Sequence, residues 1–319
     1  MRAIIFGGAG YIGTKLAEHL LSQPENSEVI ICDIQPSSLA KHPRVKYFAC
    51  DVRKPIDIAV DQADWIFNFA AIHREPGHED HEYFETNLAG AENVCNFAEK
   101  IDCKNIYFTS SISVYGPTNG PTDESCQICP ITPYGGSKYP AELIHRIWQS
   151  RHSSERRLVI VRPGVVYGPQ DPGNIGRMLN AIKRGYFAFP GSTSVKKSYA
   201  YIYGLLDSID FAIARQDPII VYNYVEKNTE SLGVVAQAMK SATGSKAPIL
   251  SIPTALLLPL AKLVQALLGN KNPIHPLRVI KAGRPTHIIP GWLISQGFPF
   301  KYSLEKSLAH WKSAHPKDF

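Results

Sequence analysis

Three glycines near the start of the chain constrain its fold more than any other feature. A short apolar run over residues 2–7 leads into Gly7, Gly10 and Gly13, and an amphipathic segment over residues 10–21 follows. This order predicts a strand, a tight turn and a helix, with glycine required where backbone approaches backbone or a ligand. The bare N–H groups at such a helix N-terminus form a site for a pyrophosphate.

The alternation of strand and helix continues along the chain. Apolar, β-rich runs recur at residues 29–33, 45–50, 65–70, 105–110, 158–162 and 219–223. Helical patterns fall at residues 83–100, 137–150, 204–215 and 232–241. Several of the strands are apolar on both faces, as in a parallel sheet that helices cover on both sides. The sequence therefore predicts an α/β fold with a doubly wound parallel sheet of the Rossmann type.

A change after Pro163 indicates a second, smaller unit. Glycine and proline become more frequent there, and the alternation stops after Ser241. We expect residues 1–163 and 203–241 to form an NAD-binding Rossmann domain, and residues 164–202 and 242–319 to form a discontinuous substrate-binding lobe. With 319 residues, of which 44% are apolar, the chain is long enough for two unequal cores.

A carboxylate downstream of the glycines indicates which dinucleotide binds. Asp33 ends the second predicted strand, twenty residues after Gly13, where a carboxylate bonds the adenosine ribose. It would repel a 2′-phosphate, and residues 34–37 offer no lysine or arginine to receive one. The sequence therefore predicts NAD rather than NADP. The alternative, that the glycines only make a tight turn, leaves their spacing to Asp33 unexplained.

A tyrosine and a lysine four residues apart form the expected reacting centre. Tyr134 and Lys138 fall on one helix face, so the ammonium is expected to lower the pKa of the phenol from ~10 toward neutrality. Ser111 follows the fifth predicted strand, at the carboxyl edge where ligands bind in such sheets. The three residues indicate hydride transfer with a nicotinamide. Packing of Tyr134 in the core is the alternative.

Together these motifs resemble the extended short-chain dehydrogenase/reductases, specifically the NAD-dependent sugar-nucleotide epimerase/dehydratase family. The resemblance includes Arg-Pro-Gly-Val-Val-Tyr-Gly-Pro at residues 162–169 and reaches residues 297–305. It implies that Tyr134 exchanges a proton with a sugar hydroxyl while the adjacent carbon gives hydride to the nicotinamide. It further implies that Lys138 bonds the nicotinamide ribose, that Ser111 bonds the reacting oxygen, and that helices around residues 83–100 and 137–150 pair in a homodimer.

The expected binding residues follow the ends of the predicted strands. Those for the cofactor are Gly7, Gly10, Tyr11, Ile12, Gly13, Asp33, Asp51, Val52, Phe69, Ala70, Ala71, Asn87, Tyr134, Lys138 and Pro163. Those for the substrate are His73, Ser113 and Lys197, the last as a point charge for a diphosphate. Asp51 either addresses the adenine or caps a helix. Asn87 either braces the turn after the fourth strand or is an ordinary polar helix residue.

Departures from the family pattern narrow the expected chemistry. Ile112 and Ser113 stand where the related 4,6-dehydratases carry an acid pair, and neither can do that acid–base work. We therefore expect an epimerase of a nucleoside-diphosphate sugar, at C4, that acts through a transient keto intermediate. Val165 replaces a family asparagine that contacts the sugar nucleotide. A dehydrogenase or ketoreductase of a sugar nucleotide or another hydroxylated substrate, and a non-catalytic NAD-binding protein, therefore stay open.

Charge is distributed unevenly along the chain. The net charge is +6, and from Lys240 onward eleven lysines and arginines stand against Glu305 and Asp318. An anionic small substrate accounts for this balance without nucleic acid. Residues 247–261 carry no charge, but this run is too short and too interrupted by proline to span a membrane. We expect a buried helix there, with a helix lying on a basic, membrane-facing surface as the alternative.

The six cysteines indicate a reducing compartment. They are scattered over residues 32–129 with no pattern of a disulfide framework, and the start of the chain shows no signal-peptide pattern. A cytoplasmic protein is the expectation. Cys126 and Cys129 have a spacing seen in zinc sites, but no partner ligands accompany them, so we expect no metal site.

Overall fold

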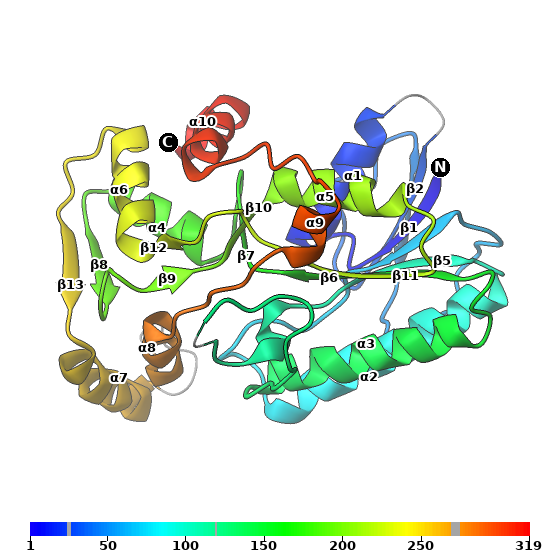
Figure 1. Cartoon of the computed structure of the whole chain (residues 1–319), viewed down its shortest axis with the longest axis horizontal. Helices are drawn as coiled ribbons and strands as arrows, with labels where there is room; N and C mark the ends of the chain where they lie inside the picture. The colour runs from blue at the N-terminus through cyan, green and yellow to red at the C-terminus, as the bar shows by residue number, and fades with distance from the viewer. Residues whose placement is uncertain (24–26, 119, 269–274) are drawn as a thin grey trace.

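A computed structural model describes residues 1–23, 27–118, 120–268 and 275–319. Its centre is a seven-stranded sheet in the order β11-β6-β5-β4-β1-β2-β3, in which every neighbouring pair is parallel (Figure 1). The strands are β1 (Arg2–Phe6), β2 (Glu28–Asp33), β3 (Val45–Ala49), β4 (Trp65–Asn68), β5 (Asn105–Thr109), β6 (Arg157–Pro163) and β11 (Ile219–Tyr224). The predicted α/β fold with a doubly wound parallel sheet is confirmed.

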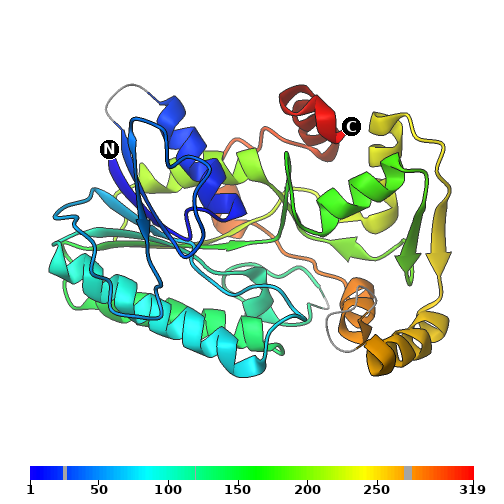
Figure 2. The same cartoon turned by 180° about the vertical axis from the view of Figure 1, so that it is seen from behind.

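Helices cover both faces of this sheet. Helices α2 (Asp80–Lys100) and α3 (Pro133–Ser150) pack side by side on one face, and α1 (Tyr11–Ser22) and α5 (Ile202–Ile213) cover the other, as the two views in Figures 1 and 2 show. Side chains alternate along a strand, so Ile4 lies in the core with α2 and α3 while Ile5 lies in the core with α1 and α5. This two-sided burial explains why the strands are apolar throughout.

Helix α3 begins at Pro133, four residues before the predicted start. Thr132 caps the helix, because its Oγ1 accepts a hydrogen bond from the Gly135 N–H at 3.2 Å. Proline fits the first helical position, where its missing N–H has no partner to lose. The earlier start places Tyr134 in the first turn of α3 and Lys138 one turn further along.

A second group of elements lies beside the carboxyl ends of the strands (Figure 1). It contains three small sheets, in which β7 (Val165–Tyr167) pairs with β10 (Tyr199–Tyr201), β8 (Phe187–Pro190) with β13 (Ile249–Ile252), and β9 (Lys196–Lys197) with β12 (Glu230–Ser231). The remaining helices are α4 (Asn174–Lys183), α6 (Leu232–Thr243), α7 (Thr254–Leu268), α8 (Pro276–Gly283), α9 (Gly291–Ser295) and α10 (Leu304–Ala314), with short 3-10 turns at Ile112–Tyr115 and Pro316–Asp318.

The contacts of two helices bear on the expected domain boundaries. Helix α6 packs against α4 and α10, although its residues fall in the range assigned to the Rossmann domain. Helix α9, from the expected lobe, packs against β11 of the large sheet. The division into two domains at these boundaries stays a prediction.

The buried helix expected for residues 247–261 is not what the structure has. Helix α7 continues through Pro259 and exposes leucines along one side, while Ala261 on another side is fully buried. Apolar composition alone predicted burial, but α7 packs chiefly on α8, which leaves the outward face uncovered. Of the helices in the described part of the chain, none is long and apolar enough to cross a membrane.

Candidate active site

The glycine turn lies where backbone segments meet without room for side chains. Gly7 has a φ of +75°, and a Cβ there would lie 2.6 Å from the backbone nitrogen of Ala70. A Cβ on Gly13 would lie 2.4 Å from the Gly7 carbonyl oxygen. The Phe69 N–H in turn donates to the Phe6 carbonyl at 2.8 Å. The backbone of Gly7 and Gly13 therefore packs directly against neighbouring backbone, including the turn after β4. This is the close approach for which the sequence predicts glycine.

The N-terminus of α1 opens into a cavity that suits a pyrophosphate. Gly10 precedes the helix and has no side chain to compete for its first N–H groups. The cavity has a volume of about 320 Å³ and is lined by Ala9, Gly10, Tyr11, Thr14, Lys15, Gln170 and Pro172. The buried Tyr11 hydroxyl has no hydrogen-bond partner in the described part of the chain, so a ligand oxygen here would satisfy it. Geometry and donors both fit a dinucleotide.

Asp33 belongs to the same turn. Its Oδ2 accepts the Ala9 N–H at 3.0 Å and its Oδ1 accepts the Gln35 N–H at 2.9 Å. The carboxylate thus holds the loop between β1 and α1 beside the end of β2. Its contact with a ribose, and that of Pro163 at the end of β6 with the cofactor, stay predictions.

Of the two residues expected near the adenine, Asp51 is in an ion pair and Val52 is buried in the core. Asp51 forms an ion pair with Arg53 at 2.7 Å, and this guanidinium holds the pKa of the carboxyl below its usual range. The side chain of Val52 is buried in the core beside Gly90, so any contact of Val52 with a ligand would be made by its backbone. The adenine contacts of both residues stay predictions.

Asn87 braces the segment after β4. Its Oδ1 accepts the Ile72 N–H at 3.0 Å, and its Nδ2 donates to the Ile72 carbonyl and, at 2.8 Å, to the Ser137 hydroxyl. Ser137 then donates to the Tyr134 carbonyl at 2.9 Å. This chain of bonds fixes the loop after β4 relative to the first turn of α3, which favours the bracing role over that of an ordinary polar helix residue.

Ser111 and Tyr134 come together from distant parts of the sequence. Ser111 caps the 3-10 turn that follows β5, and its hydroxyl hydrogen-bonds with the Tyr134 phenol. It also donates to the Ser113 hydroxyl at 3.1 Å. Gly135 allows this approach, because a Cβ there would lie 2.4 Å from the Ser113 carbonyl oxygen. The structure thus brings the predicted serine and tyrosine into one hydrogen-bonded set.

The pKa values of this set correct one expectation. Burial raises the pKa of Tyr134 to about 12, although the hydrogen bond with Ser111 opposes the shift. Burial lowers the pKa of Lys138 to about 7, with Glu142 acting in the opposite direction. The Lys138 ammonium lies 4.3 Å from the centroid of the Phe108 ring. Desolvation therefore dominates both groups, and the expected depression of the tyrosine pKa by Lys138 is wrong.

A buried ion pair, which the sequence analysis did not identify, anchors the reacting residues. Arg162 of β6 donates two hydrogen bonds to the Glu142 carboxylate of α3, at 2.9 and 2.7 Å. Glu142 also accepts from Ser110, the neighbour of Ser111. Arg162 donates further to the Tyr115 hydroxyl at 2.8 Å. The network joins β6, α3 and the turn after β5, so it fixes the position of Ser111 relative to Tyr134. The spacing of Glu142 four residues after Lys138 was the available signal.

Glu75 closes the rim of the site and was also missed. Its Oε1 accepts the Tyr134 N–H at 3.0 Å, and its Oε2 pairs with Lys281 of α8. Glu75 lies in a loop rich in charged residues, but its side chain is only 10% exposed. Its partner lies 206 residues away in the sequence, so no local pattern could have indicated the contact.

The residues expected to bind the substrate differ in exposure and in the hydrogen bonds that they already make. His73 is exposed at the rim, and desolvation together with the charge of Arg74 lowers its pKa. The Lys197 ammonium donates to the backbone carbonyls of Lys281, at 2.9 Å, and Arg284. Lys197 therefore holds the end of α8, and a diphosphate would have to replace these carbonyls to bind it. The substrate contacts of His73, Ser113 and Lys197 stay predictions.

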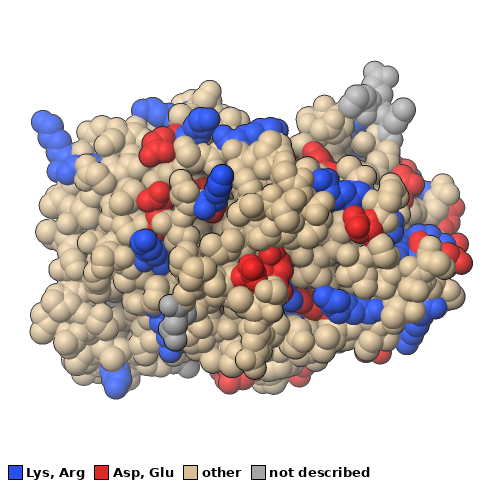
Figure 3. Space-filling model, in the orientation of Figure 1, with Lys and Arg blue, Asp and Glu red and all other residues tan. Residues whose placement is uncertain are grey.

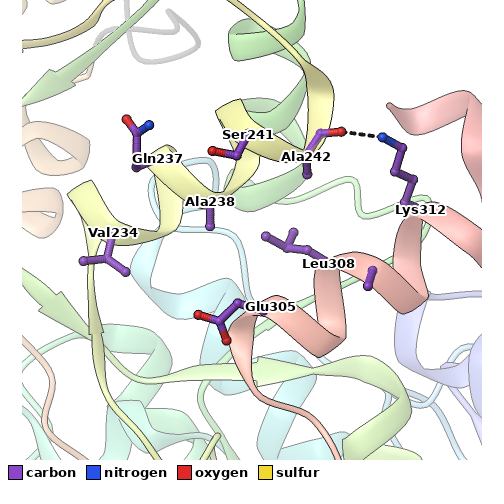
Figure 4. A pocket seen from close by; sticks show the side chains of 9 residues that line it. Val234, Gln237, Ala238, Ser241, Ala242, Glu305, Leu308 and Lys312 are labelled. Carbon is purple, nitrogen blue, oxygen red and sulfur yellow. Dashed lines mark hydrogen bonds between the residues drawn. The ribbon is translucent and has the colours of Figure 1, made fainter.

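A larger groove lies elsewhere, between α6 and α10. Figure 4 shows its apolar lining, including Ala238 and Leu308, and the hydrogen bond from Lys312 to the Ala242 carbonyl at 2.6 Å. Its volume is about 610 Å³, but none of the predicted catalytic or cofactor residues lines it. Size alone does not identify the site of chemistry here.

Comparison with known proteins agrees with this geometry. The parallel sheet, the glycine turn and the serine–tyrosine–lysine set define an extended short-chain dehydrogenase/reductase. A family model described as the NAD dependent epimerase/dehydratase family matches residues 3–224. The chain belongs to this family, which confirms the resemblance, and the predicted cofactor NAD agrees with the family description.

Relatives and solved structures match almost the whole chain. An Escherichia coli O157:H7 protein, N-acetyl-alpha-D-glucosaminyl-diphospho-ditrans,octacis-undecaprenol 4-epimerase, is 29% identical over 315 residues, covering 96% of this chain and 92% of the relative. A UDP-glucose 4-epimerase from Streptococcus mutans serotype c is 26% identical over 281 residues, covering 78% and 83%. The structure of UDP-glucuronic acid 4-epimerase from Bacillus cereus, with UDP-glucuronic acid and NAD, superposes with a TM-score of 0.77 at 18% identity and covers 100% of both chains.

Proposed function

We propose that the chain is an NAD-dependent 4-epimerase of a sugar carried on a diphosphate, with nucleoside-diphosphate sugars as the substrate class to be assayed first. The family and the names of the relatives support this proposal. The observation that supports it most is the pairing of Ser111 with Tyr134, which lies one helical turn before Lys138 on α3. A non-catalytic NAD-binding protein would have no need of this set.

The roles of the residues follow from their chemistry. The glycine turn at Gly7, Gly10 and Gly13, with Asp33, would hold NAD, which would supply a hydride acceptor and donor for the sugar carbon. Tyr134 removes the proton from the hydroxyl on that carbon and later gives it back, while Ser111 hydrogen-bonds to the same oxygen. Because the pKa of Tyr134 is about 12, positive charge must lie beside the phenol for it to ionise near neutral pH. Lys138 does not act on the pKa of the phenol here, because its ammonium lies against the Phe108 ring, and its proposed role is the contact with the nicotinamide ribose.

Epimerisation, rather than loss of water, agrees with the residues at the turn after β5. Ile112 is buried and Ser113 accepts a hydrogen bond from Ser111, so neither offers the acid–base pair that elimination requires. An epimerase needs no further group if the ketone rotates in the pocket before hydride returns. We therefore favour a reaction that leaves NAD unchanged after each cycle.

Two kinds of carrier for the sugar agree with the proposal, a nucleotide and a polyprenol. The Streptococcus mutans relative is named for UDP-glucose, and the Escherichia coli relative for a sugar on a polyprenol diphosphate. Both molecules present a hexose through a diphosphate, and the same reacting centre serves either. Val165, in place of a family asparagine, is half-buried in the β7–β10 pair and gives the nucleotide one polar contact fewer.

The location and assembly of the protein also belong to the proposal. All six cysteines are unpaired, as expected in a reducing cytoplasm. Apolar side chains of α2 and α3 lie exposed on the outer side of that helix pair, namely Phe84, Leu143 and Ile147. We propose that this surface forms the homodimer of a cytoplasmic enzyme.

Replacement of Tyr134 tests the function. Tyr134→Phe is expected to lower kcat by about 10²–10⁴-fold, because the phenol that moves the proton is lost, and to leave NAD bound. The measurement is interconversion of UDP-glucose or UDP-N-acetylglucosamine with its 4-epimer by NMR, at NAD concentrations far below those of substrate. Tyr139→Phe, on the same helix but outside the set, is the matched control. Unchanged turnover in Tyr134→Phe would refute the role, and consumption of NAD in step with substrate would identify a dehydrogenase instead.

A further inference from the structure

Four exposed leucines form a continuous line along α7. Leu256, Leu260, Leu263 and Leu267, here called the leucine ridge, are 68%, 48%, 57% and 73% exposed. Their spacing of four, three and four residues places them within an arc of about 60° on the helix. Leu250 and Ile252 of β13, the strand that leads into α7, are exposed as well. Exposed apolar patches of this continuity indicate a surface that binds something.

The sequence segment that contains the ridge carries charges of one sign. Between Glu230 and Glu305 the sequence contains no acidic residue and eight lysines and arginines. Lys246, Lys262, Arg278 and Arg284 of this segment are all exposed. In Figure 3 the corner of the molecule that α7 and α8 occupy is mainly uncharged, with isolated basic side chains and no acidic one in this view.

Exposed leucines beside basic residues indicate which kind of partner the ridge binds. An apolar helix face flanked by lysine and arginine is the pattern of a helix that lies in the interface of an anionic bilayer. A second copy of the chain fits less well, because a two-fold contact would bring two basic segments together without acids to neutralise them. Charge therefore favours an anionic lipid surface over self-association.

The ridge is linked to the reacting centre through α8. Helix α7 packs on α8, whose Lys281 pairs with Glu75, and Glu75 in turn accepts the Tyr134 N–H. Lys197 donates to the backbone carbonyls of Lys281 and Arg284 at this same C-terminal end of α8. A surface bound to α7 would therefore lie one helix away from the rim of the site.

We propose that the leucine ridge docks on an anionic phospholipid bilayer and presents the rim of the catalytic site to the membrane surface. This inference rests on the proposed function, and it extends the substrate class to a sugar diphosphate on a membrane-held polyprenyl lipid. The diphosphate of such a lipid lies at the headgroup level, where a docked enzyme reaches the sugar without extracting the tail.

Vesicle binding tests the docking surface. The full chain is sedimented with vesicles of phosphatidylcholine mixed with phosphatidylglycerol and with vesicles of phosphatidylcholine alone. We expect binding to the anionic vesicles that weakens in high salt, and partition at least about tenfold weaker for Leu260→Gln/Leu263→Gln, because two leucines are withdrawn from the interface. Lys262→Gln should weaken binding as well, whereas Lys306→Gln on α10 should not.

Controls separate this inference from the proposed function. Ile294→Gln on α9 removes an exposed apolar side chain elsewhere and should bind vesicles as the unmodified protein does. UDP-sugar epimerisation in solution should be unchanged in Leu260→Gln/Leu263→Gln, which also shows that the variant folds. Absence of vesicle binding, or equal binding by the double variant, would overturn the docking and leave the function standing. A mass in solution that falls in the double variant, with no vesicle binding, would identify the ridge as an interface between copies and overturn the proposal.

Discussion

The glycine turn and the corner of the molecule formed by α7 and α8, here called the α7 corner, differ in how closely their atoms are packed. At the turn, a methyl group on Gly13 would lie 2.4 Å from a backbone oxygen, whereas one on Gly283 at the end of α8 would meet nothing within 4 Å. The large sheet buries apolar side chains on both faces, and α7 leaves four leucines in solvent. The difference indicates that close packing determines the cofactor half, while the α7 corner retains apolar surface that contributes little to folding.

The largest expected effect on the free energy of unfolding comes from breaking a buried ion pair, which is compared with an exposed one. Arg162→Met leaves the buried Glu142 carboxyl without its ion-pair partner, so we expect the free energy of unfolding to fall by about 3–5 kcal/mol in urea denaturation. Lys104→Met removes the partner of Asp102 and Glu155 at the surface, where water screens the charges, and its effect should be much smaller than that of Arg162→Met. Equal effects of the two substitutions would break the contrast.

Removal of one leucine from each region compares their packing directly. Leu16 is completely buried between α1 and the sheet, and Leu16→Ala should lower the free energy of unfolding by about 2–5 kcal/mol. Leu263→Ala takes away a leucine that is 57% exposed, and the change should lie within about 0.5 kcal/mol. A large loss in Leu263→Ala would show that the ridge is part of a core. The measurement is again urea denaturation of the full chain.

The pH dependence of stability supplies the smallest of the three effects. Burial raises the pKa of Glu226 to about 7, and its carboxylate accepts a hydrogen bond from Tyr167. In the unfolded chain the pKa is near 4.5, so the folded protein binds more protons between these values and loses stability as pH rises through this window. We expect a loss of about 1–3 kcal/mol between pH 5 and 8 that Glu226→Gln abolishes. A pH profile that is the same in both proteins would show that Glu226 ionises freely in the fold.

The sequence determined the sheet better than the rim of the site. The strands of the large sheet were predicted from short apolar runs, such as Val29 to Cys32 in β2, which two-sided burial explains, and this signal is local. Ser111, Tyr134 and Lys138 were predicted because their spacing follows from helix geometry and strand ends. The glycine spacing likewise reflects backbone contacts within the first seventy residues.

The remaining features depend on contacts that no local pattern contains. Glu75 was not predicted as part of the site because its partner Lys281 lies 206 residues away along the chain. Lys197 was expected to bind a diphosphate, but its ammonium donates a hydrogen bond to a backbone carbonyl at the end of α8. Helix α7 was expected to be buried because composition reports how apolar a helix is and not which of its faces a neighbour covers. The pKa of Tyr134 depends on the depth of burial, which spacing does not reveal.

The bond between Glu75 and Lys281 has a consequence for the order in which the protein is made. Synthesis proceeds from the N-terminus, and β1, β2, β4 and the glycine turn are complete once the first seventy residues have emerged. The residue that fastens the loop over Tyr134 emerges more than two hundred positions later. A nascent chain therefore contains the residues of its dinucleotide cradle long before it contains the lysine that completes the rim of the site.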